Sequence, residues 1–495
     1  MTARLRRSRL AAWGAVIMLA AATAGCTGGT AGGGASTPPP SATGGTTAPT
    51  TGVTAPTAGP GVTPVGAKWD WGRFDSYRPY LASLSGGSTY YEFVWCDIEP
   101  SPGHRDWSTV DKVAQRTREI GMRLLLKIRV GRCWATSGEA QFSRGKANKT
   151  ESGMPRDLAA YAAFVKEAVQ RYSAYGVTEF ALENEVNSPS YWGGTPDELR
   201  QLVTVGARAI HEADRQAKVV DFGLASTTYG YGIADDLLKA GDEAGAVRAY
   251  NQYYERRFGT RGARLPQVST AAQLRQVLAA EQGVRNLTYL AMASELARQG
   301  VVDVRQFHFY EKWSNVPMLL AYLSRHTPSG TPIEAWEVGS FWKGAATDDA
   351  QRSDEMVKTV SSLLAGGVRT AIWLPLAVDP SGRNADEPRY GLIDPSGSVR
   401  AAGTAMSGIA EAARSAHAVP VAKDGLSGVG FEKGDTSTMY LWGSAGSVTV
   451  RSGASAGPVG ATLRRVSAGQ TVAVSEAPVE VRVDEPVATF LSGQR

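Results

Sequence analysis

The chain has 495 residues, 43% of them hydrophobic, with 12 tryptophans, which is enough for one large domain of about 250 to 350 residues and a small module. The formal net charge is +5, from 52 basic and 47 acidic residues, and four arginines lie within the first nine positions. The remainder is close to neutral and has no polybasic tract, so nucleic acid is excluded as the expected partner.

The first 26 residues have the pattern of an export signal. Arginines at 4 to 9 are followed by the apolar stretch Leu10 to Ala22 and by small residues up to Cys26, which is the order of charged, apolar and cleavage regions in a signal peptide. The ending Ala24-Gly25-Cys26 resembles the lipobox of bacterial lipoproteins. This resemblance implies a lipid on Cys26 and attachment to the outer face of the cell membrane, or else secretion.

Residues 27–66 consist of Thr, Gly, Ala, Ser and Pro apart from three Val, without charged or aromatic side chains. Such a composition cannot bury enough apolar surface to offset the entropy of ordering. We therefore expect a disordered tether whose 40 residues span on the order of 35 Å.

From residue 67 to 417, apolar strand patterns alternate with amphipathic helix patterns, which favours a parallel sheet. Asp157 to Tyr172 illustrates the helices, and Thr195 with Glu198 and Pro196 predicts the start of another. Eight such units predict an α/β fold closed into a (β/α)8 TIM barrel, with strands near Ala67–Trp71, Tyr90–Trp95, Arg123–Val130, Glu179–Asn184, Val219–Ala225, Val302–Tyr310, Pro332–Trp336 and Val368–Pro375.

A long connection at 226–299 follows the fifth predicted strand and contains its own helical runs. Insertions after a barrel strand lie on the catalytic face, so this segment is a candidate lid or subsite wall. Its tyrosines are either sugar-stacking side chains or ordinary packing, namely Tyr229, Tyr231, Tyr250, Tyr253 and Tyr254.

Residues 418–495 show short strand patterns separated by Gly and Ser, which predicts a small antiparallel β-sandwich. The last predicted strand is Val487 to Leu491. This module either braces the barrel or binds carbohydrate through Tyr440 or Trp442.

Two of the predicted strands are followed directly by a carboxylate, Glu185 and Glu337. Residues at the carboxyl ends of barrel strands face the active site, and a pair of carboxylates on opposite sides of a bond is what glycosidic cleavage requires. Strand alternation predicts that Glu183 lies about 6.5 Å deeper than Glu185 on the same face, in a polar network with Arg or Lys. It also predicts that Ile333, Ala335 and Glu337 share one face, and that Glu334 is structural.

The motifs around these carboxylates resemble the clan A retaining glycoside hydrolases. Asn184-Glu185 and Glu337 match the acid/base and the nucleophile of the clan, and the run from Trp95 to Gly103 resembles its family 39, the β-xylosidase and α-L-iduronidase family. Further matches are His308-Phe309-Tyr310, Pro332-Ile333 with Gly339, and Trp373.

This resemblance implies specific roles. Glu185 would protonate the leaving oxygen and then activate water, and Glu337 would attack the anomeric carbon. Asn184 would bind the sugar 2-hydroxyl, and Tyr310 would hold Glu337 in place. His308 is a sugar-binding donor or a satisfied rim histidine, and Trp373 is a sugar platform or core packing. The remaining histidines lack metal-ligand spacing, so neither a metal nor another cofactor is expected.

Two further features stay open. Cys96 and Cys133 follow neighbouring predicted strands, so they either form a disulfide, which export permits, or are two buried thiols. Glu99 either contacts sugar or pairs with Lys127 or Arg129.

The sequence thus predicts an exported retaining glycoside hydrolase acting on an oligosaccharide or polysaccharide. The alternatives are a non-catalytic polysaccharide-binding barrel and a transglycosylase that uses the same residues. The sugar, the anomer and the oligomeric state are not determined.

Overall fold

A computed structural model of the chain describes residues 61–140, 143–144, 149–259, 265–340, 349–377 and 391–494. The predicted signal sequence, Cys26 and most of the predicted tether lie outside these residues. Within them, no helix has both the length and the hydropathy that a membrane crossing requires.

Eight parallel strands form one sheet in the order β7-β6-β3-β2-β1-β10-β9-β8. A bridge between Val220 of β7 and Val304, next to β8, joins the two edge strands and closes the sheet. The predicted TIM barrel is confirmed, with strands β1 (Val65–Ala67), β2 (Ser88–Val94), β3 (Arg123–Arg129), β6 (Glu179–Leu182), β7 (Lys218–Val220), β8 (Arg305–Phe309), β9 (Ile333–Val338) and β10 (Ala371–Trp373).

The first strand begins earlier than predicted. Val65 is buried and pairs with Ala371 of β10, so the barrel starts within the segment expected to be the end of the tether. Trp71, predicted as the last residue of that strand, instead begins the 3-10 helix η1 (Trp71–Arg73), because Asp70 accepts a hydrogen bond from the backbone of Gly72 and turns the chain.

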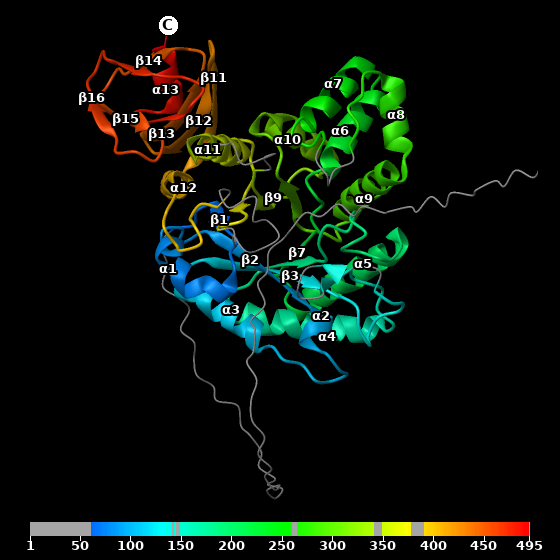
Figure 1. Cartoon of the computed structure of the whole chain (residues 1–495). Helices are drawn as coiled ribbons and strands as arrows, with labels where there is room; N and C mark the ends of the chain where they lie inside the picture. Colours follow the sequence, from blue (N-terminus) through cyan, green and yellow to red (C-terminus); the bar gives the residue numbers. More distant parts are fainter. Residues whose placement is uncertain are drawn as a thin grey trace, which may run out of the picture.

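Helices surround the barrel (Figure 1). The helix α5 starts with the predicted capping box of Thr195 and Glu198. The outer helices are α1 (Phe74–Ala82), α3 (Ser108–Glu119), α4 (Leu158–Ser173), α5 (Pro196–Ala213), α9 (Glu281–Arg298), α10 (Val316–His326), α11 (Asp349–Ala365) and α12 (Ala401–Ala412). Shorter elements are α2 (Trp95–Ile98), η2 (Trp313–Asn315), β4 (Ser143–Arg144) and β5 (Lys149–Thr150).

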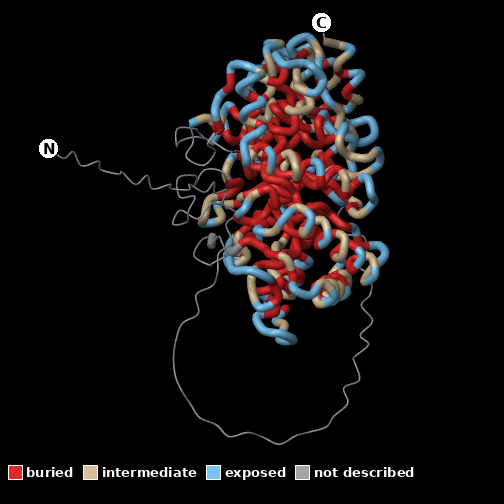
Figure 2. The backbone as a smooth tube through the Cα atoms, turned by 90° about the vertical axis from the view of Figure 1, so that its right-hand side faces the viewer, coloured by how far each residue is buried: buried red, intermediate tan, exposed pale blue. Residues whose placement is uncertain are grey.

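The barrel has an inner and an outer apolar layer. Seven buried residues fill the inside of the barrel, from Tyr90 on β2 to Ile372 on β10. A much larger cluster lies between the strands and the helices and continues into the C-terminal part of the chain. In Figure 2 the buried residues accordingly run from the middle of the molecule into the end that carries the C-terminus.

The insertion after β7 forms α6 (Thr228–Lys239), α7 (Glu243–Tyr253) and α8 (Ala271–Ala279) before the chain continues into α9. All five of the tyrosines considered for sugar stacking or packing are buried. They pack against one another, with the Tyr250 and Tyr254 rings 4.8 Å apart, and the Tyr253 hydroxyl donates to the Ser226 carbonyl. The stacking interpretation is therefore wrong, because these rings form the core of the insertion.

The C-terminal part contains a six-stranded antiparallel sheet and a two-stranded one, which confirms the predicted second architecture. Val487 to Leu491 is not a strand but lies in the helix α13 (Val487–Ser492), whose Val487 and Phe490 are buried. The strands are β11 (His417–Lys423), β12 (Leu426–Lys433), β13 (Thr436–Gly443), β14 (Ser447–Thr449), β15 (Ala454–Pro458), β16 (Arg464–Val466), β17 (Thr471–Ala473) and β18 (Val479–Val483).

This module packs on α11 and α12 (Figure 1). Trp442 of β13 makes an edge contact with Trp313 of the barrel at 5.7 Å, and the Lys358 ammonium group lies 4.8 Å from the centre of the Trp313 ring. Tyr440 and Trp442 are both buried. Carbohydrate binding through these two rings is therefore contradicted, and they brace the barrel instead.

Candidate active site

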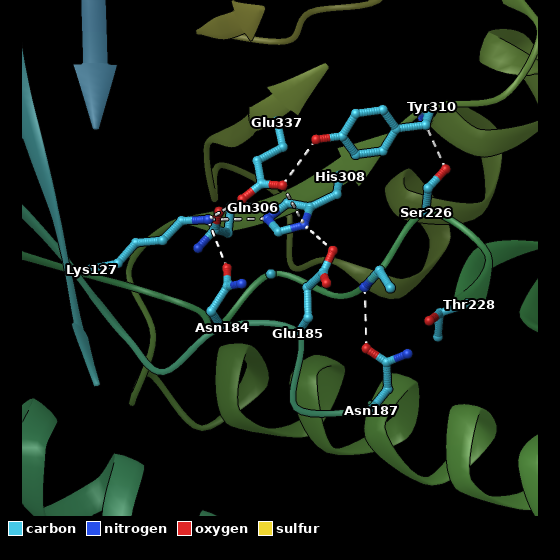
Figure 3. Close-up of polar contacts among 12 residues, drawn as sticks. Lys127, Asn184, Glu185, Asn187, Ser226, Thr228, Gln306, His308, Tyr310 and Glu337 are labelled. Carbon is cyan, nitrogen blue, oxygen red and sulfur yellow. Dashed lines mark hydrogen bonds and ion pairs between the residues drawn. The ribbon is translucent and has the colours of Figure 1, made fainter. Parts of the chain in front are cut away.

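A cluster of buried polar side chains lies at the carboxyl ends of the barrel strands (Figure 3). It brings together residues from five strands, because parallel strands present the same end to one edge of the sheet. Its members are Tyr90 from β2, Lys127 from β3, Asn184 and Glu185 after β6, His308 and Tyr310 at the end of β8, and Glu337 from β9.

Glu185 is positioned by a turn and not by strand alternation. β6 ends at Leu182, and both Glu183 and Glu185 have positive φ, at 69° and 44°, a backbone conformation that is unfavourable for residues with a side chain. The Glu185 backbone N–H donates to the carbonyls of Phe222 (3.1 Å) and Gly223 (3.0 Å), which follow β7. The prediction that Glu183 and Glu185 lie along one face of a strand is therefore wrong, because both follow the end of β6.

Glu183 is fully buried below this turn. It accepts a hydrogen bond from the Val130 backbone at 2.8 Å, and its Oε2 lies 3.5 Å from Nε of Arg129. The structure thus places it in a buried polar network with an arginine.

Glu337 reaches the site because β9 is irregular. Phe307 of β8 pairs with Ala335, but the next residue, His308, pairs with Glu337. Trp336 is therefore an extra residue in β9. Trp336 fills the inside of the barrel, whereas Ala335 packs in the outer layer. The extra residue restores Glu337 to the inner side, as expected at a β-bulge. The prediction that Ile333, Ala335 and Glu337 share a face is wrong for this reason.

The two carboxylates lie close together. One oxygen of Glu185, one oxygen of Glu337 and one ring nitrogen of His308 are all within 4.8 Å of one another. Nδ1 of His308 is 2.8 Å from Oε1 of Glu185 and 3.5 Å from Oε2 of Glu337. His308 therefore lies between the two carboxylates and holds their relative position.

The oxygens of Glu337 have different partners. Oε1 accepts hydrogen bonds from the Tyr90 hydroxyl (2.9 Å) and the Lys127 ammonium (2.8 Å). Oε2 accepts one from the Tyr310 hydroxyl at 3.0 Å and lies on the side of Glu185. Oε2 is thus the oxygen that faces the space between the carboxylates.

Glu337 is an anion at every ordinary pH. Burial raises the pKa of its carboxyl group, but the charges of His308 and Lys127 and the hydrogen bonds from Lys127 and Tyr90 outweigh that effect and lower the pKa to about 2. Burial, followed by the charge of Glu337, raises the pKa of Tyr90 and of Tyr310 well above the usual value. Both tyrosines consequently remain neutral hydrogen-bond donors.

His308 connects the buried ammonium group to Glu185. Its Nε2 lies 3.3 Å from the Lys127 ammonium, and its Nδ1 lies 2.8 Å from Oε1 of Glu185. The two ring nitrogens therefore link Lys127 on β3 with the turn after β6.

Glu185, His308 and Glu337 also have the spacing of a possible metal site. In the structure, Nδ1 of His308 contacts the two carboxylates directly, at 2.8 Å from Glu185 and 3.5 Å from Glu337. The Lys127 ammonium contacts the other ring nitrogen of His308 and the other oxygen of Glu337.

The remaining predicted residues are less central. The Asn184 carbonyl accepts a hydrogen bond from Lys127 at 2.7 Å, which leaves its amide N–H groups for another partner. Trp373 on β10 is only 3% exposed and belongs to the outer apolar layer, and its role as a sugar platform stays a prediction.

Cys96 and Cys133 form a disulfide that connects the segments after β2 and β3. Glu99 pairs with Arg105 at 2.7 Å and also accepts hydrogen bonds from Trp95 and from the backbone of Gly103. The predicted pairing of Glu99 with Lys127 or Arg129 is wrong, because both of those side chains are used inside the barrel.

Two residues of the site, Lys127 and Tyr90, were not among those predicted from the sequence. The sequence did contain a signal for Lys127, because this lysine interrupts an otherwise apolar run from Leu124 to Ile128. In the structure every residue of that run is buried. Lysine is almost never fully buried unless it is paired. Its position in that run indicates a buried anion, although not which one.

Solved structures of similar fold include several glycoside hydrolases. One is a family 39 glycoside hydrolase from Bacteroides cellulosilyticus WH2, with a TM-score of 0.58 and 12% identity over 86% of this chain and 81% of that chain. A family 39 β-xylosidase from Caulobacter crescentus has a TM-score of 0.53 and 13% identity over 87% and 98%. A family 30 endoxylanase from Clostridium papyrosolvens C71 has a TM-score of 0.51 and 12% identity over 86% and 97%.

No protein-family model matches the sequence, and neither does any curated protein. The solved structures of similar fold confirm the predicted resemblance to clan A at the level of the fold. The fold and the site together define an α/β barrel with two adjacent buried carboxylates at its catalytic end.

Proposed function

We propose that this protein is a retaining glycoside hydrolase with Glu185 as acid/base and Glu337 as nucleophile. The observation that carries the proposal is the spacing of the two carboxylates, within 4.8 Å at their nearest oxygens. Retaining enzymes hold such a pair about 5 to 5.5 Å apart, whereas inverting enzymes need about 6.5 to 9.5 Å to admit a water molecule.

In the first step, Oε2 of Glu337 attacks the anomeric carbon while the bond to the leaving oxygen breaks. Glu185 donates its proton to that oxygen. The anionic state of Glu337 supports its role as the attacking group. The hydrogen bond from Tyr310 holds Oε2 in one orientation before attack.

In the second step, Glu185 is a carboxylate and removes a proton from water as the water attacks the anomeric carbon. The ester bond to Glu337 breaks, and the configuration of the sugar is retained. The contact between Nδ1 of His308 and Oε1 of Glu185, at 2.8 Å, holds the carboxylate in position for this step.

The substrate class is an O-glycoside of an oligosaccharide or polysaccharide. Because structures named as a β-xylosidase and an endoxylanase share the fold, β-D-xylosides are the first compounds to test. The activity of those proteins is not carried over, since sequence identity is near 12% and a fold supports many specificities.

The test is incubation with a panel of aryl glycosides and polysaccharides, with NMR of the first-formed product. Retention of configuration is expected in the wild type and loss of turnover in Glu337→Gln. Inversion would overturn the mechanism, and binding of a polymer without any cleavage would favour the receptor alternative. Glycosyl transfer to an added sugar in place of water would identify a transglycosylase.

We also infer from residues 1–26 that the protein is exported and lipid-anchored at Cys26, with carbohydrate outside the membrane as its partner. Fractionation of cells that express the wild type and Cys26→Ser tests this inference. Membrane association is expected for the wild type alone, and cytoplasmic recovery of both proteins would contradict export.

A further inference from the structure

We propose that Lys127 is a positioning residue that couples the charge of the nucleophile to recognition of the sugar 2-hydroxyl. This inference rests on the proposed function of the site. Lys127 is the buried cation that contacts both Glu337, the proposed nucleophile, and Asn184, the residue expected to bind that hydroxyl.

The geometry of Lys127 allows little freedom. Its side chain has no exposed surface, and Nζ donates to Oε1 of Glu337 at 2.8 Å and to Oδ1 of Asn184 at 2.7 Å. The Tyr90 ring lies 4.2 Å from Nζ, a contact that favours a cation. Three strands and a turn therefore fix one ammonium group.

The bond to Asn184 determines which way its amide points. An ammonium group can only donate, so Oδ1 of Asn184 must face Lys127 and the amide N–H groups must face away from it. These N–H groups are then available to the oxygen of a sugar hydroxyl. Without Lys127, the amide can rotate and present its oxygen instead, which would weaken recognition of the 2-hydroxyl.

The bond to Glu337 acts on the chemistry. When Oε2 forms the ester bond to the sugar, Oε1 becomes the carbonyl oxygen and still accepts hydrogen bonds from Lys127 and Tyr90. When water attacks, the C1–Oε2 bond breaks and the electron pair returns to the carboxylate, whose negative charge Lys127 stabilises. Lys127 thereby makes Glu337 a better leaving group in the second step.

Charged or titratable side chains face Glu337 from several neighbouring elements. They are Tyr90 on β2, Lys127 on β3, Glu185 after β6, and His308 and Tyr310 at the end of β8. Of these groups, Lys127 is the one whose ammonium group donates directly to Oε1 of Glu337, at 2.8 Å. Removing it should raise the pKa of Glu337 and move the acid limb of the kcat/KM profile to higher pH.

The experiment compares Lys127→Met with the wild type on p-nitrophenyl β-D-xyloside and on its 2-deoxy analogue. We expect kcat/KM on the parent compound to fall by about 100-fold. The ratio of kcat/KM between the two substrates should fall by at least about tenfold, because part of the loss acts through the 2-hydroxyl. Asn184→Ala should lower the same ratio, and the double variant should add little to it.

Lys127→Gln separates the two contacts, because an amide can still donate to Asn184 but has no charge. It should keep the preference for the 2-hydroxyl and still move the acid limb upwards. Lys358→Met is the matched control, since Lys358 is another buried lysine near aromatic rings, at the boundary with the C-terminal module. It tests the general effect of removing a buried ammonium group and should change neither readout.

The two proposals fail in different ways. Absence of turnover in the wild type on the whole glycoside panel would overturn the proposed function. Normal turnover with an unchanged substrate ratio in Lys127→Met would overturn the coupling. A carbon-13 NMR titration of the labelled glutamates gives an answer without catalysis, since an unchanged Glu337 pKa in Lys127→Met would also contradict the inference.

Discussion

Strands β6 and β9 bring glutamates together at both ends of the barrel, and the two pairs differ in charge. At the carboxyl end, Glu337 has a pKa lowered to about 2. At the opposite end, Glu179 of β6 lies beside Glu334 of β9, and burial, followed by the charge of Glu334, raises the pKa of Glu179 to about 7. One end therefore holds an anion and the other holds a proton near neutral pH.

The difference lies in the positive groups. The pair at the carboxyl end, Glu185 and Glu337, is called the upper pair. It is contacted by the fully buried Lys127 and by His308. The pair at the opposite end, Glu179 and Glu334, is called the lower pair. Both of its members contact Arg369, whose side chain is 42% exposed, so water partly screens the charge of the guanidinium group. At the upper pair, His308, Lys127 and the hydrogen bonds to Glu337 outweigh the effect of burial, whereas at the lower pair burial outweighs the effect of Arg369.

The largest expected effect is from Glu337→Gln, which removes the anion of the upper pair. Turnover should fall by about 10,000-fold or more, because no other carboxylate can attack the anomeric carbon. Kinetics on an activated aryl glycoside measure this loss. Azide added to Glu337→Gly should restore activity with inverted product, and retained turnover without azide would contradict the assignment.

Glu185→Gln should have the next largest effect, a loss of about 100- to 10,000-fold in kcat/KM. The loss should be smaller for substrates with acidic leaving groups, such as dinitrophenyl glycosides, because these need little protonation. A series of aryl glycosides of graded leaving-group pKa measures the dependence. Equal losses along the whole series would argue against Glu185 as the acid.

At the lower pair, Glu334→Ala should affect stability and not catalysis. It leaves the buried indole N–H of Trp336, which donates to Glu334 at 2.6 Å, without that acceptor. We expect the free energy of unfolding to fall by about 2 to 4 kcal/mol while turnover at 25 °C stays within about twofold. Denaturant titration and steady-state kinetics on the same preparation check both parts.

The smallest expected effect is the pH dependence of stability that comes from Glu179. Because its folded-state pKa is above that of the unfolded chain, the folded protein binds the extra proton between about pH 4.5 and 7. Its contribution to stability is present below that range and is lost as the pH rises through about 7. Relative to Glu179→Gln, the wild type should lose on the order of 2 kcal/mol between pH 5 and 8. Parallel stability curves for the two proteins would contradict this prediction.

The sequence predicted the barrel well, because eight apolar strand patterns and their intervening helices are local signals. It also indicated Glu185 and Glu337, each of which follows an apolar run. It failed where the backbone departs from regular alternation: at the turn with positive φ around Glu185 and at the bulge around Trp336. At Tyr440 and Trp442 it left bracing and carbohydrate binding open, because burial against the barrel is a long-range effect that no local pattern records.

What the sequence determined by itself, then, is the order of elements and the types of side chain at the ends of the strands. These depend on periodicity and on residue chemistry within a few positions of each other. The tertiary structure alone decided which cation meets which anion. Lys127 and Glu337 are 210 residues apart and become partners only because the barrel closes, and His308 and Lys127 together keep Glu337 an anion while Glu179 holds a proton.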